Sequence, residues 1–290
     1  MTDYLALMQA EFPWLVLATS LILGLLIGSF LNVVVYRLPI MLQRDWQQQA
    51  HDILSHPAPP GAPPFNLVVP HSRCPHCGHA IKPWENIPVL SYCFLRGKCS
   101  ACSSPISARY PLVEALTGIL TLVVVYYFGA TAAGLGACVL TWALVALALI
   151  DYDHQLLPDD ITLPMLWLGL VVNSFAVLCS FEAAFWGAVA GYLVFWIVYQ
   201  VFKLFTGREG MGYGDFKLLA MLGAWLGWQS LPLIIILSSF AGALVGGTLI
   251  ALGRDKAKPI PFGPYLAIAG WVALVWGDTI TASYLQFVMV

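Results

Sequence analysis

Charged side chains are scarce in this chain of 290 residues: Asp, Glu, Lys and Arg together make up 10% of it, and hydrophobic residues make up 60%. An ordinary soluble domain is roughly 45–50% apolar. The shortage of charge therefore argues against a soluble globular protein and indicates a membrane protein.

Common sequence signatures of other protein classes are also missing. The chain contains neither H-E-x-x-H, which supplies zinc ligands in metalloproteases, nor G-x-S-x-G, which presents a nucleophilic serine. It shows no internal repeat of the kind found in many secondary transporters. Any peptide-bond chemistry in this chain must therefore come from other side chains.

Long uncharged runs predict the membrane helices. Residues 14–36, 161–180, 183–202 and 259–277 form runs of 23, 20, 20 and 19 residues without charge. Each suits one helix of about 20 residues across a bilayer core of about 30 Å. Two runs of 36 residues, 115–150 and 218–253, break near Gly129 and near 229–232, so each suits two short spans. We expect an all-α polytopic membrane protein with about eight transmembrane helices.

The basic residues predict the orientation. Eight spans that start from an outside N-terminus place four segments in the cytoplasm, namely 37–111, 151–160, 203–217 and 253–258. These segments hold all 13 Lys and Arg residues, as expected for cytoplasmic loops. We expect periplasmic termini, a membrane anchor over 1–36, a cytoplasmic loop domain over 37–111 and a transmembrane core over 112–290. No basic stretch precedes the first span and no cleavage site follows it, so we expect it to be an anchor and not a signal peptide.

Four cysteines in the loop predict a metal site. Cys74, Cys77, Cys99 and Cys102 form two C-x2-C pairs that are 21 residues apart. Such pairs suit tetrahedral zinc, and a β-hairpin between them would return the second pair to the first. Four thiolates leave no open coordination position, so we predict one structural zinc ion that stabilises a small loop domain.

Disulfides and unligated thiols are the alternatives to a metal site at these cysteines. A reducing cytoplasm disfavours disulfides. His71, His76 and His79 lie beside the first pair and could replace a cysteine ligand. Histidines that are simply solvated in a loop would fit the sequence equally well.

Two aspartates lie at the predicted cytoplasmic edge of the membrane. Asp151 directly follows the run 115–150, and Asp215 shortly precedes the run 218–253. Ionisable groups at membrane depth commonly mark functional sites. Further acids follow Asp151, and their negative field could attract a basic substrate. They are Asp153, Asp159 and Asp160.

Both aspartates could also have purely structural roles. Asp215 could cap the N-terminus of the next helix, and Asp151 could be a solvated loop acid. A cap does not account for Gly210, Gly212 and Gly214, which permit positive φ and close backbone approach just before Asp215.

Two neighbouring aspartates support peptide hydrolysis without a metal or a nucleophilic side chain. Like charges a few ångströms apart do not readily ionise together, so one acid keeps its proton. The carboxylate takes a proton from the attacking water. The acid hydrogen-bonds the carbonyl oxygen and later protonates the leaving amine.

At these residues the chain resembles the type IV prepilin peptidases, which are bifunctional leader peptidases and N-methyltransferases among the GxGD aspartic proteases of membranes. Besides the two cysteine pairs, the resemblance covers GSFLNVVVYRLP at 28–39, PWENIP at 83–88, RYPLVE at 109–114, DYDHQLLPD at 151–159, GMGYGDFKLLAMLGAW at 210–225 and PIPFGPYLAIAGW at 259–271. It therefore runs nearly from end to end.

The resemblance implies that Asp151 and Asp215 are the catalytic pair and that the four cysteines bind zinc. It also implies an inner-membrane enzyme with its active site on the cytoplasmic side. Such an enzyme removes the short basic leader of type IV prepilins and type II secretion pseudopilins after a glycine. It then methylates the new N-terminal amine with S-adenosylmethionine. These substrates and membrane lipid would be its partners, and no nucleic acid is expected.

The methyltransferase site is not evident from the sequence. Residues 37–111 are too few for a Rossmann domain, and no G-x-G-x-x-G follows a strand there. The pocket for the methyl donor must be built another way, for example between the zinc loop and the spans. Glu85 and Glu114 could orient a cationic donor or an amine, although solvated loop acids need no such role.

Two other functions compete with this interpretation. A proton- or cation-coupled transporter also places acids inside a helical bundle, but would be favoured by repeats or broken helices in matching halves. A scaffold with a zinc-stabilised loop would account for the cysteines but gives the glycines before Asp215 no purpose.

The predicted orientation can be tested with alkaline phosphatase, which is active only in the periplasm. Fusions after residue 130 or residue 290 should be active, and fusions after residue 156 or residue 210 inactive, because all 13 basic residues lie in the predicted cytoplasmic segments. Activity of the fusions after residues 156 and 210 would contradict the predicted topology.

Overall fold

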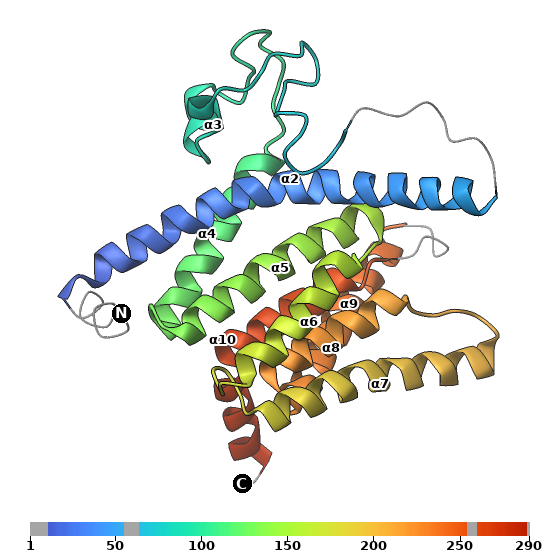
Figure 1. Cartoon of the computed structure of the whole chain (residues 1–290). Coiled ribbons are helices and arrows are strands. Elements are labelled where there is room, and N and C mark those ends of the chain that lie inside the picture. The colour runs from blue at the N-terminus through green and yellow to red at the C-terminus, as the bar shows by residue number, and fades with distance from the viewer. Residues whose placement is uncertain (1–10, 55–63, 254–259, 289–290) are drawn as a thin grey trace. The chain divides into compact units, whose positions relative to one another are not determined.

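The computed structural model describes residues 11–54, 64–253 and 260–288, and helices without any β-strand make up its regular structure over those ranges. The chain divides into two compact units, Met1–Tyr126 and Tyr127–Val290. The first contains α2 (Pro13–Ile53), the 3-10 helix η1 (Pro83–Asn86), α3 (Leu90–Phe94) and most of α4 (Arg109–Phe128). The second contains α5 (Ala132–His154), α6 (Asp159–Asn173), α7 (Phe181–Thr206), α8 (Tyr213–Leu226), η2 (Trp228–Ser230), α9 (Leu231–Ala251) and α10 (Gly263–Val288) (Figure 1).

The expected all-α membrane architecture is confirmed. Among the described residues, six helices are long and apolar enough to cross a membrane: α2, α4, α5, α7, α9 and α10. The other two predicted spans correspond to α6 and α8, which have 15 and 14 residues. Each of the eight predicted spans thus contains one helix, although two of these helices are short for a membrane crossing.

Two of the helix boundaries show why the uncharged runs break. Gly129 lies between α4 and α5 with φ +68°, a conformation that glycine adopts readily. Thr131 then caps α5, since its hydroxyl accepts a hydrogen bond from the Gly134 N–H at 3.1 Å. Gly227, with φ +81°, ends α8 and leads into η2. The predicted interruption of both long runs is confirmed.

Asn173 ends α6 earlier than the uncharged run suggested. Its side-chain amide donates to the carbonyls of Ala224 and Trp225 at 2.9 and 3.0 Å. Its side-chain oxygen accepts from the N–H groups of Leu178 and Cys179. A buried amide satisfied in this way fixes the turn after α6 against the end of α8.

The first helix extends far beyond its apolar run. α2 continues to Ile53, whereas we expected the loop to begin at residue 37. Its last part, residues 37–53, contains four Gln together with Leu, Met, Arg and Ala, which have good helix propensity. The change from apolar to polar sequence therefore ends the apolar stretch but not the helix. Residues 55–66, SHPAPPGAPPFN, are Pro-rich, which predicts a linker with little regular structure. Residues 55–63 of this segment lie outside the described residues.

Small residues bring α2 and α4 together in the first unit. A Cβ on Gly28 would lie 2.8 Å from the Glu114 Cα, and one on Gly24 would lie 2.8 Å from the Gly118 Cα. In lipid, where helices gain little from the hydrophobic effect, such close backbone approach is a main source of helix association. The contact seats Glu114 beside α2.

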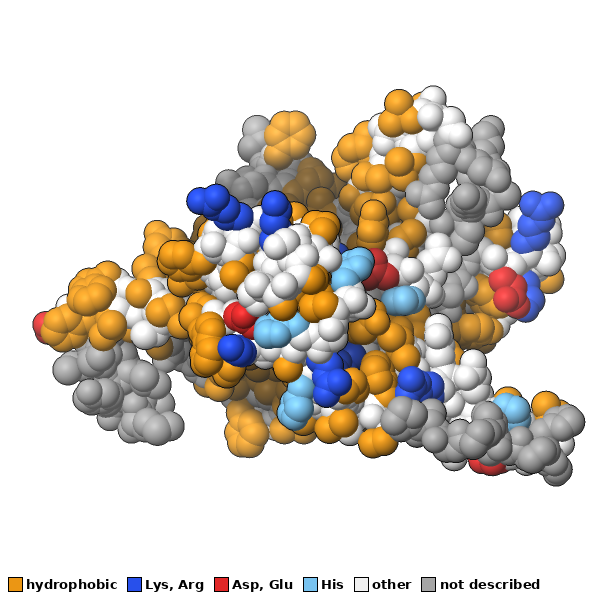
Figure 2. Space-filling model, turned by 90° about the horizontal axis from the view of Figure 1, so that it is seen from above, with side chains coloured by type: hydrophobic (Ala, Val, Ile, Leu, Met, Phe, Trp, Pro, Cys, Tyr) orange, Lys and Arg blue, Asp and Glu red, His pale blue; other side chains and the backbone are white. Residues whose placement is uncertain are grey.

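Helix α8 is the core of the second unit. It packs against α6, α7, α9 and α10, and the segment from Leu218 to Trp225 is buried throughout. A helix that is apolar on all sides belongs in an interior. By contrast, Leu204 and Phe205 are each 82% exposed, and hydrophobic side chains spread over the face shown in Figure 2. An apolar exterior suits a protein that faces lipid.

Glycines allow α7 and α8 to touch along their backbones. A Cβ on Gly187 would overlap the Gly223 carbonyl, and a Cβ on Gly223 would overlap the Gly187 carbonyl. One turn further on, a Cβ on Gly191 would lie 2.6 Å from the Leu219 carbonyl oxygen. The position of α8, and of the Asp215 side chain that it carries, therefore depends on residues without side chains.

We expect Gly187→Ala and Gly223→Ala to destabilise the protein, since overpacking typically costs about 1–3 kcal/mol. The unfolding midpoint of the purified protein in detergent measures this effect. Gly247→Ala is the matched control, because a Cβ there meets no atom within 4 Å. Equal midpoints for all three variants would contradict the assigned packing.

Candidate active site and metal centre

Asp151 lies in the last turn of α5, with 6% of its surface exposed. The helix ends at His154, and Gln155 turns the chain with φ +53°. The Asp151 Oδ2 atom accepts a hydrogen bond from the Gly263 N–H at 2.9 Å. Gly263 is the first residue of α10, where N–H groups lack partners within the helix and attract negative charge. Asp151 is therefore a buried acid and not a solvated loop residue.

The close approach of α10 requires a glycine. A Cβ on Gly263 would lie 2.6 Å from Asp151 Oδ2 and 3.2 Å from Leu157. Any other side chain would push the N–H donor away from the carboxylate. Sequence reasoning did not single out Gly263, although its place between Phe262 and Pro264 at the start of an apolar run was a usable signal.

Asp215 lies in the first turn of α8 and is 8% exposed. The N-cap residue of α8 is Gly212, so the alternative in which Asp215 is the N-cap is wrong. Asp215 instead occupies the third helical position, with its Oδ2 atom 3.8 Å from where a Cβ on Gly212 would lie. The positive end of the helix dipole favours a carboxylate there, but burial of the side chain opposes its ionisation.

The glycines before Asp215 permit close packing and do not adopt positive φ angles. None of Gly210, Gly212 and Gly214 has a positive φ, contrary to one of the two roles expected for them. A Cβ on Gly210 would lie 2.7 Å from the Phe202 ring, and one on Gly214 would lie 2.9 Å from the Leu157 Cβ. The expectation of close approach is confirmed for these two positions.

The two acids belong to one site. The charge of Asp151 acts electrostatically on Asp215. Leu157, which is 8% exposed, lies against the backbone both at Gly214, one residue before Asp215, and at Gly263, which binds Asp151. Segments from α5, α8 and α10, far apart in sequence, thus meet around two buried carboxyl groups.

Two further contacts hold the start of α8 in place. Tyr213 and Phe216 pack against Tyr199 of α7, with ring centroids 5.3 and 5.7 Å away. Lys217 Nζ lies 2.7 Å from both carboxylate oxygens of Asp159 at the start of α6. The charge of Asp159 is thus paired within the chain, so this acid contributes less to attraction of a substrate than expected.

The four predicted metal ligands lie together. The sulfur atoms of Cys74, Cys77, Cys99 and Cys102 are all within 4.8 Å of one another. The separations are 3.8 Å between Cys74 and Cys102 and 4.0 Å between Cys77 and Cys99. Among the described residues, this cluster can hold one metal ion, and none of the three nearby histidines belongs to it.

The two cysteine pairs sit on equivalent turns. The Cys74 N–H donates to the His79 carbonyl and the Cys99 N–H to the Ser104 carbonyl, both at 2.9 Å. Gly78 and Ser103, each directly after the second cysteine of a pair, have positive φ. Each turn points two thiols in one direction, which is the arrangement that a tetrahedral metal ion needs.

The connection between the two pairs differs from the prediction. We expected a β-hairpin, but η1 and α3 occupy the interval, and the β-bridges lie within the turns, at Arg73 with Ala80 and at Lys98 with Pro105. Pro83 begins η1, since proline suits the first turn of a helix and cannot donate to a strand partner.

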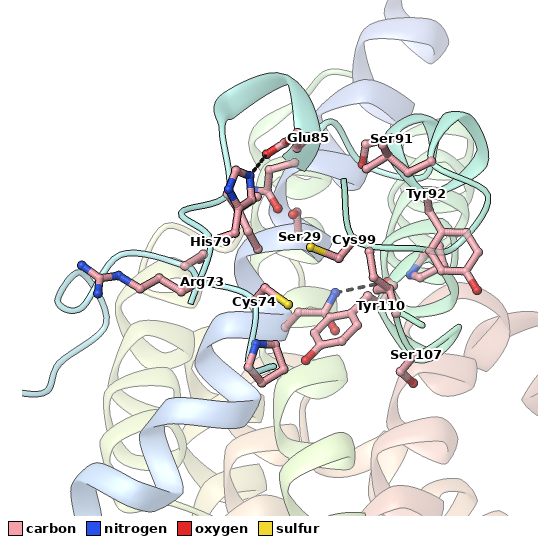
Figure 3. A pocket seen from close by; sticks show the side chains of 18 of the residues that line it. Ser29, Arg73, Cys74, His79, Glu85, Ser91, Tyr92, Cys99, Ser107 and Tyr110 are labelled. Atoms are coloured by element: carbon pink, nitrogen blue, oxygen red, sulfur yellow. Dashed lines mark hydrogen bonds and ion pairs between the residues drawn. The ribbon is translucent and has the colours of Figure 1, made fainter. Parts of the chain in front are cut away.

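A pocket of about 460 Å³ lies beside the cysteine cluster in the first unit (Figure 3). Both Glu85 and Glu114 line it. The Lys82 N–H, with help from Ser100 and His79, lowers the pKa of Glu85 to about 2. Glu114 is 8% exposed and accepts a hydrogen bond from the Val89 N–H at 2.8 Å. Neither is a solvated loop acid.

Comparison with known proteins identifies the family. Residues 22–128 match the bacterial peptidase A24 N-terminal domain, and residues 138–247 match the type IV leader peptidase family. No solved structure matches the chain.

Several curated relatives carry the name prepilin leader peptidase/N-methyltransferase. The Stutzerimonas stutzeri protein is 61% identical over 96% of each chain, and the Pseudomonas aeruginosa protein is 55% identical over 98% of this chain and 97% of its own. The Aeromonas hydrophila protein is 55% identical over 94% of this chain and 95% of its own. These relatives give no support to a transporter. The chain therefore belongs to the prepilin leader peptidase/N-methyltransferase family, as the resemblance implied.

Proposed function

We propose that this protein removes the basic leader peptide from type IV prepilins and type II secretion pseudopilins and then methylates the new N-terminal amine. Relatives of 61% and 55% identity are named for both activities. The observation that supports the peptidase most directly is the pair of buried acids, Asp151 and Asp215, on segments that Leu157 joins.

We assign the general base to Asp151 and the general acid to Asp215. The N–H of Gly263 donates to Asp151, and a hydrogen bond of this kind favours the ionised carboxylate. A second negative charge nearby is unfavourable, so Asp215 retains its proton.

Hydrolysis then needs only these two side chains and water. Asp151 takes a proton from the water whose oxygen bonds to the scissile carbonyl carbon, while Asp215 hydrogen-bonds the carbonyl oxygen. The carbon–nitrogen bond breaks as a proton passes to the leaving amine, and the dyad returns to its starting charge. No covalent intermediate with the enzyme is formed.

The site suits a substrate at the inner edge of the bacterial inner membrane. Asp151 ends α5 and Asp215 begins α8, and the expected topology places both on the cytoplasmic side. A prepilin keeps its basic leader in the cytoplasm and its apolar helix in the lipid, so its scissile bond lies at the same depth.

We assign the metal as zinc with a structural role. Four thiolates bound at about 2.3 Å in a tetrahedron would lie about 3.8 Å apart, close to the measured 3.8 and 4.0 Å. Cys74, Cys77, Cys99 and Cys102 would hold the ion and fix the loop domain of residues 37–111. Because sulfur atoms would then fill all four coordination positions of the ion, the ion needs no part in cleavage.

The methyl donor is S-adenosylmethionine, whose sulfonium carries a transferable methyl group. The chain must bind this cation and present the newly cut amine to it. When bound, the donor would supply its methyl group to the nitrogen of that amine, which would release a proton.

Replacement of either catalytic acid should abolish cleavage. Asp151→Asn and Asp215→Asn preserve side-chain size but remove the proton acceptor or donor, and general acid–base catalysis typically contributes about 10²–10⁴-fold in rate. The measurement is the gel shift of a purified prepilin incubated with the enzyme in detergent.

Asp278→Asn is the matched control for this experiment, because Asp278 is an exposed acid in α10 that lies 15 residues after Gly263 along that helix. It should cleave at the normal rate. Full cleavage by either Asp151→Asn or Asp215→Asn would exclude the dyad.

Metal analysis should find one zinc ion per chain, and Cys74→Ser or Cys102→Ser should lower the occupancy sharply. Four thiolates are needed to close the site. Cys138→Ser should retain the full metal content, because Cys138 is buried in α5, outside the cluster. Unchanged zinc content in the first two variants would disprove the assigned site.

A further inference from the structure

The pocket in the first unit is formed by membrane helices as well as by the loop. Ser29, Asn32 and Tyr36 of α2 line it, and Tyr110 and Glu114 of α4 form another part of its wall. Figure 3 shows Glu85 and His79 from the loop and Ser29 from α2 around the same space. The loop alone would not enclose it.

We propose that this pocket binds S-adenosylmethionine and that Glu85 and Glu114 face the positive charges of the donor. The inference rests on the proposed function, because it supplies the donor site that the methyltransferase activity requires. A volume of about 460 Å³ lies within the range of about 300–1,000 Å³ found for small-molecule sites.

The two carboxylates are the first reason to expect a cationic ligand. Glu114 is buried and bonded to the Val89 N–H, with the Ser29 hydroxyl also interacting. Glu85 Oε2 accepts from the Lys82 N–H at 2.9 Å and lies 3.2 Å from His79 Nε2. In the described part of the chain, neither is paired with Lys or Arg. Glu114 is moreover buried, and acids are seldom buried without a cationic partner.

The buried arginine that lines the pocket binds other groups. Arg37 also lines the pocket, but it donates to the carbonyls of Asn66 and Pro70 at 2.9 and 2.6 Å. It therefore holds the loop against α2 and does not neutralise the two acids. S-adenosylmethionine carries a sulfonium and an ammonium group, two positive charges that are complementary to the two carboxylates.

Aromatic side chains are a further feature of the pocket that suits S-adenosylmethionine. Tyr36, Tyr92 and Tyr110 line the pocket. Tyrosine rings attract cations over their faces, and their flat surfaces suit an adenine ring. The pocket thus complements two features of the donor, its positive charge and its planar base.

Donor binding tests the proposal on the full chain in detergent. Isothermal titration with S-adenosylmethionine should show that Glu85→Gln and Glu114→Gln each weaken binding about tenfold or more, because each variant loses one electrostatic contact with a positive charge of the donor. S-adenosylhomocysteine lacks the sulfonium charge but keeps the ammonium group, so its affinity should fall less in the variant that removes the acid facing the sulfonium. Glu182→Gln, which changes an exposed acid at the start of α7, is the matched control and should bind both normally.

A second variant fills the pocket without removing a charge. Val33→Trp places a large ring at a lining position and should abolish donor binding. Leu26→Trp, at a 54% exposed position of the same helix that does not line the pocket, should leave binding unchanged. Prepilin cleavage should be normal in all these variants, which shows that they are folded.

Distinct results separate failure of the inference from failure of the proposed function. If wild-type protein methylates a processed pilin peptide while the Glu85, Glu114 and Val33 variants bind the donor normally, the pocket assignment is wrong. The same holds if these variants impair cleavage of the prepilin but leave donor affinity intact. If wild-type protein neither cleaves nor methylates, the proposed function itself fails.

Discussion

The proposed peptidase site depends on one electrostatic constraint, namely that two carboxyl groups lie close together where water is largely excluded. Asp151 and Asp215 are 6% and 8% exposed, and the charge of one acts on the other. Such an arrangement is unfavourable unless one group keeps its proton. Much of the second unit serves to maintain it: the Gly263 N–H binds Asp151, and the glycine contacts between α7 and α8 seat the helix that carries Asp215.

In the first unit, a loop must be stabilised and held beside two helices. Its loop has little apolar core. Arg37 of α2 binds the loop at Asn66 and Pro70, and the metal ion proposed at the four cysteines would stabilise it further. Close approach of α2 and α4 through Gly28 brings Glu114 beside the loop. The pocket therefore lies between the loop with the cysteine cluster and the two helices, and the helices form its rigid wall.

Short-range patterns predicted much of the fold because they depend on local chemistry. Uncharged runs locate helices, since lipid excludes charge, and the cysteine spacing reflects two tight turns. The predictions for the connection between the turns and for the end of α2 were wrong. A β-hairpin and a helix are close in energy over a few residues, and the polar end of α2 is stabilised by helix propensity and not by apolar pattern.

The sequence by itself determined the membrane class, the helix positions and which side chains are candidates for the chemistry, because each of these follows from composition and from spacing along the chain. Only the tertiary structure decided that Gly263 donates to Asp151, that Leu157 joins both acid-bearing segments, and that Glu85 and Glu114 share a pocket. These contacts link residues far apart in the chain. Their existence depends on which helix faces pack together, and no local pattern encodes that choice.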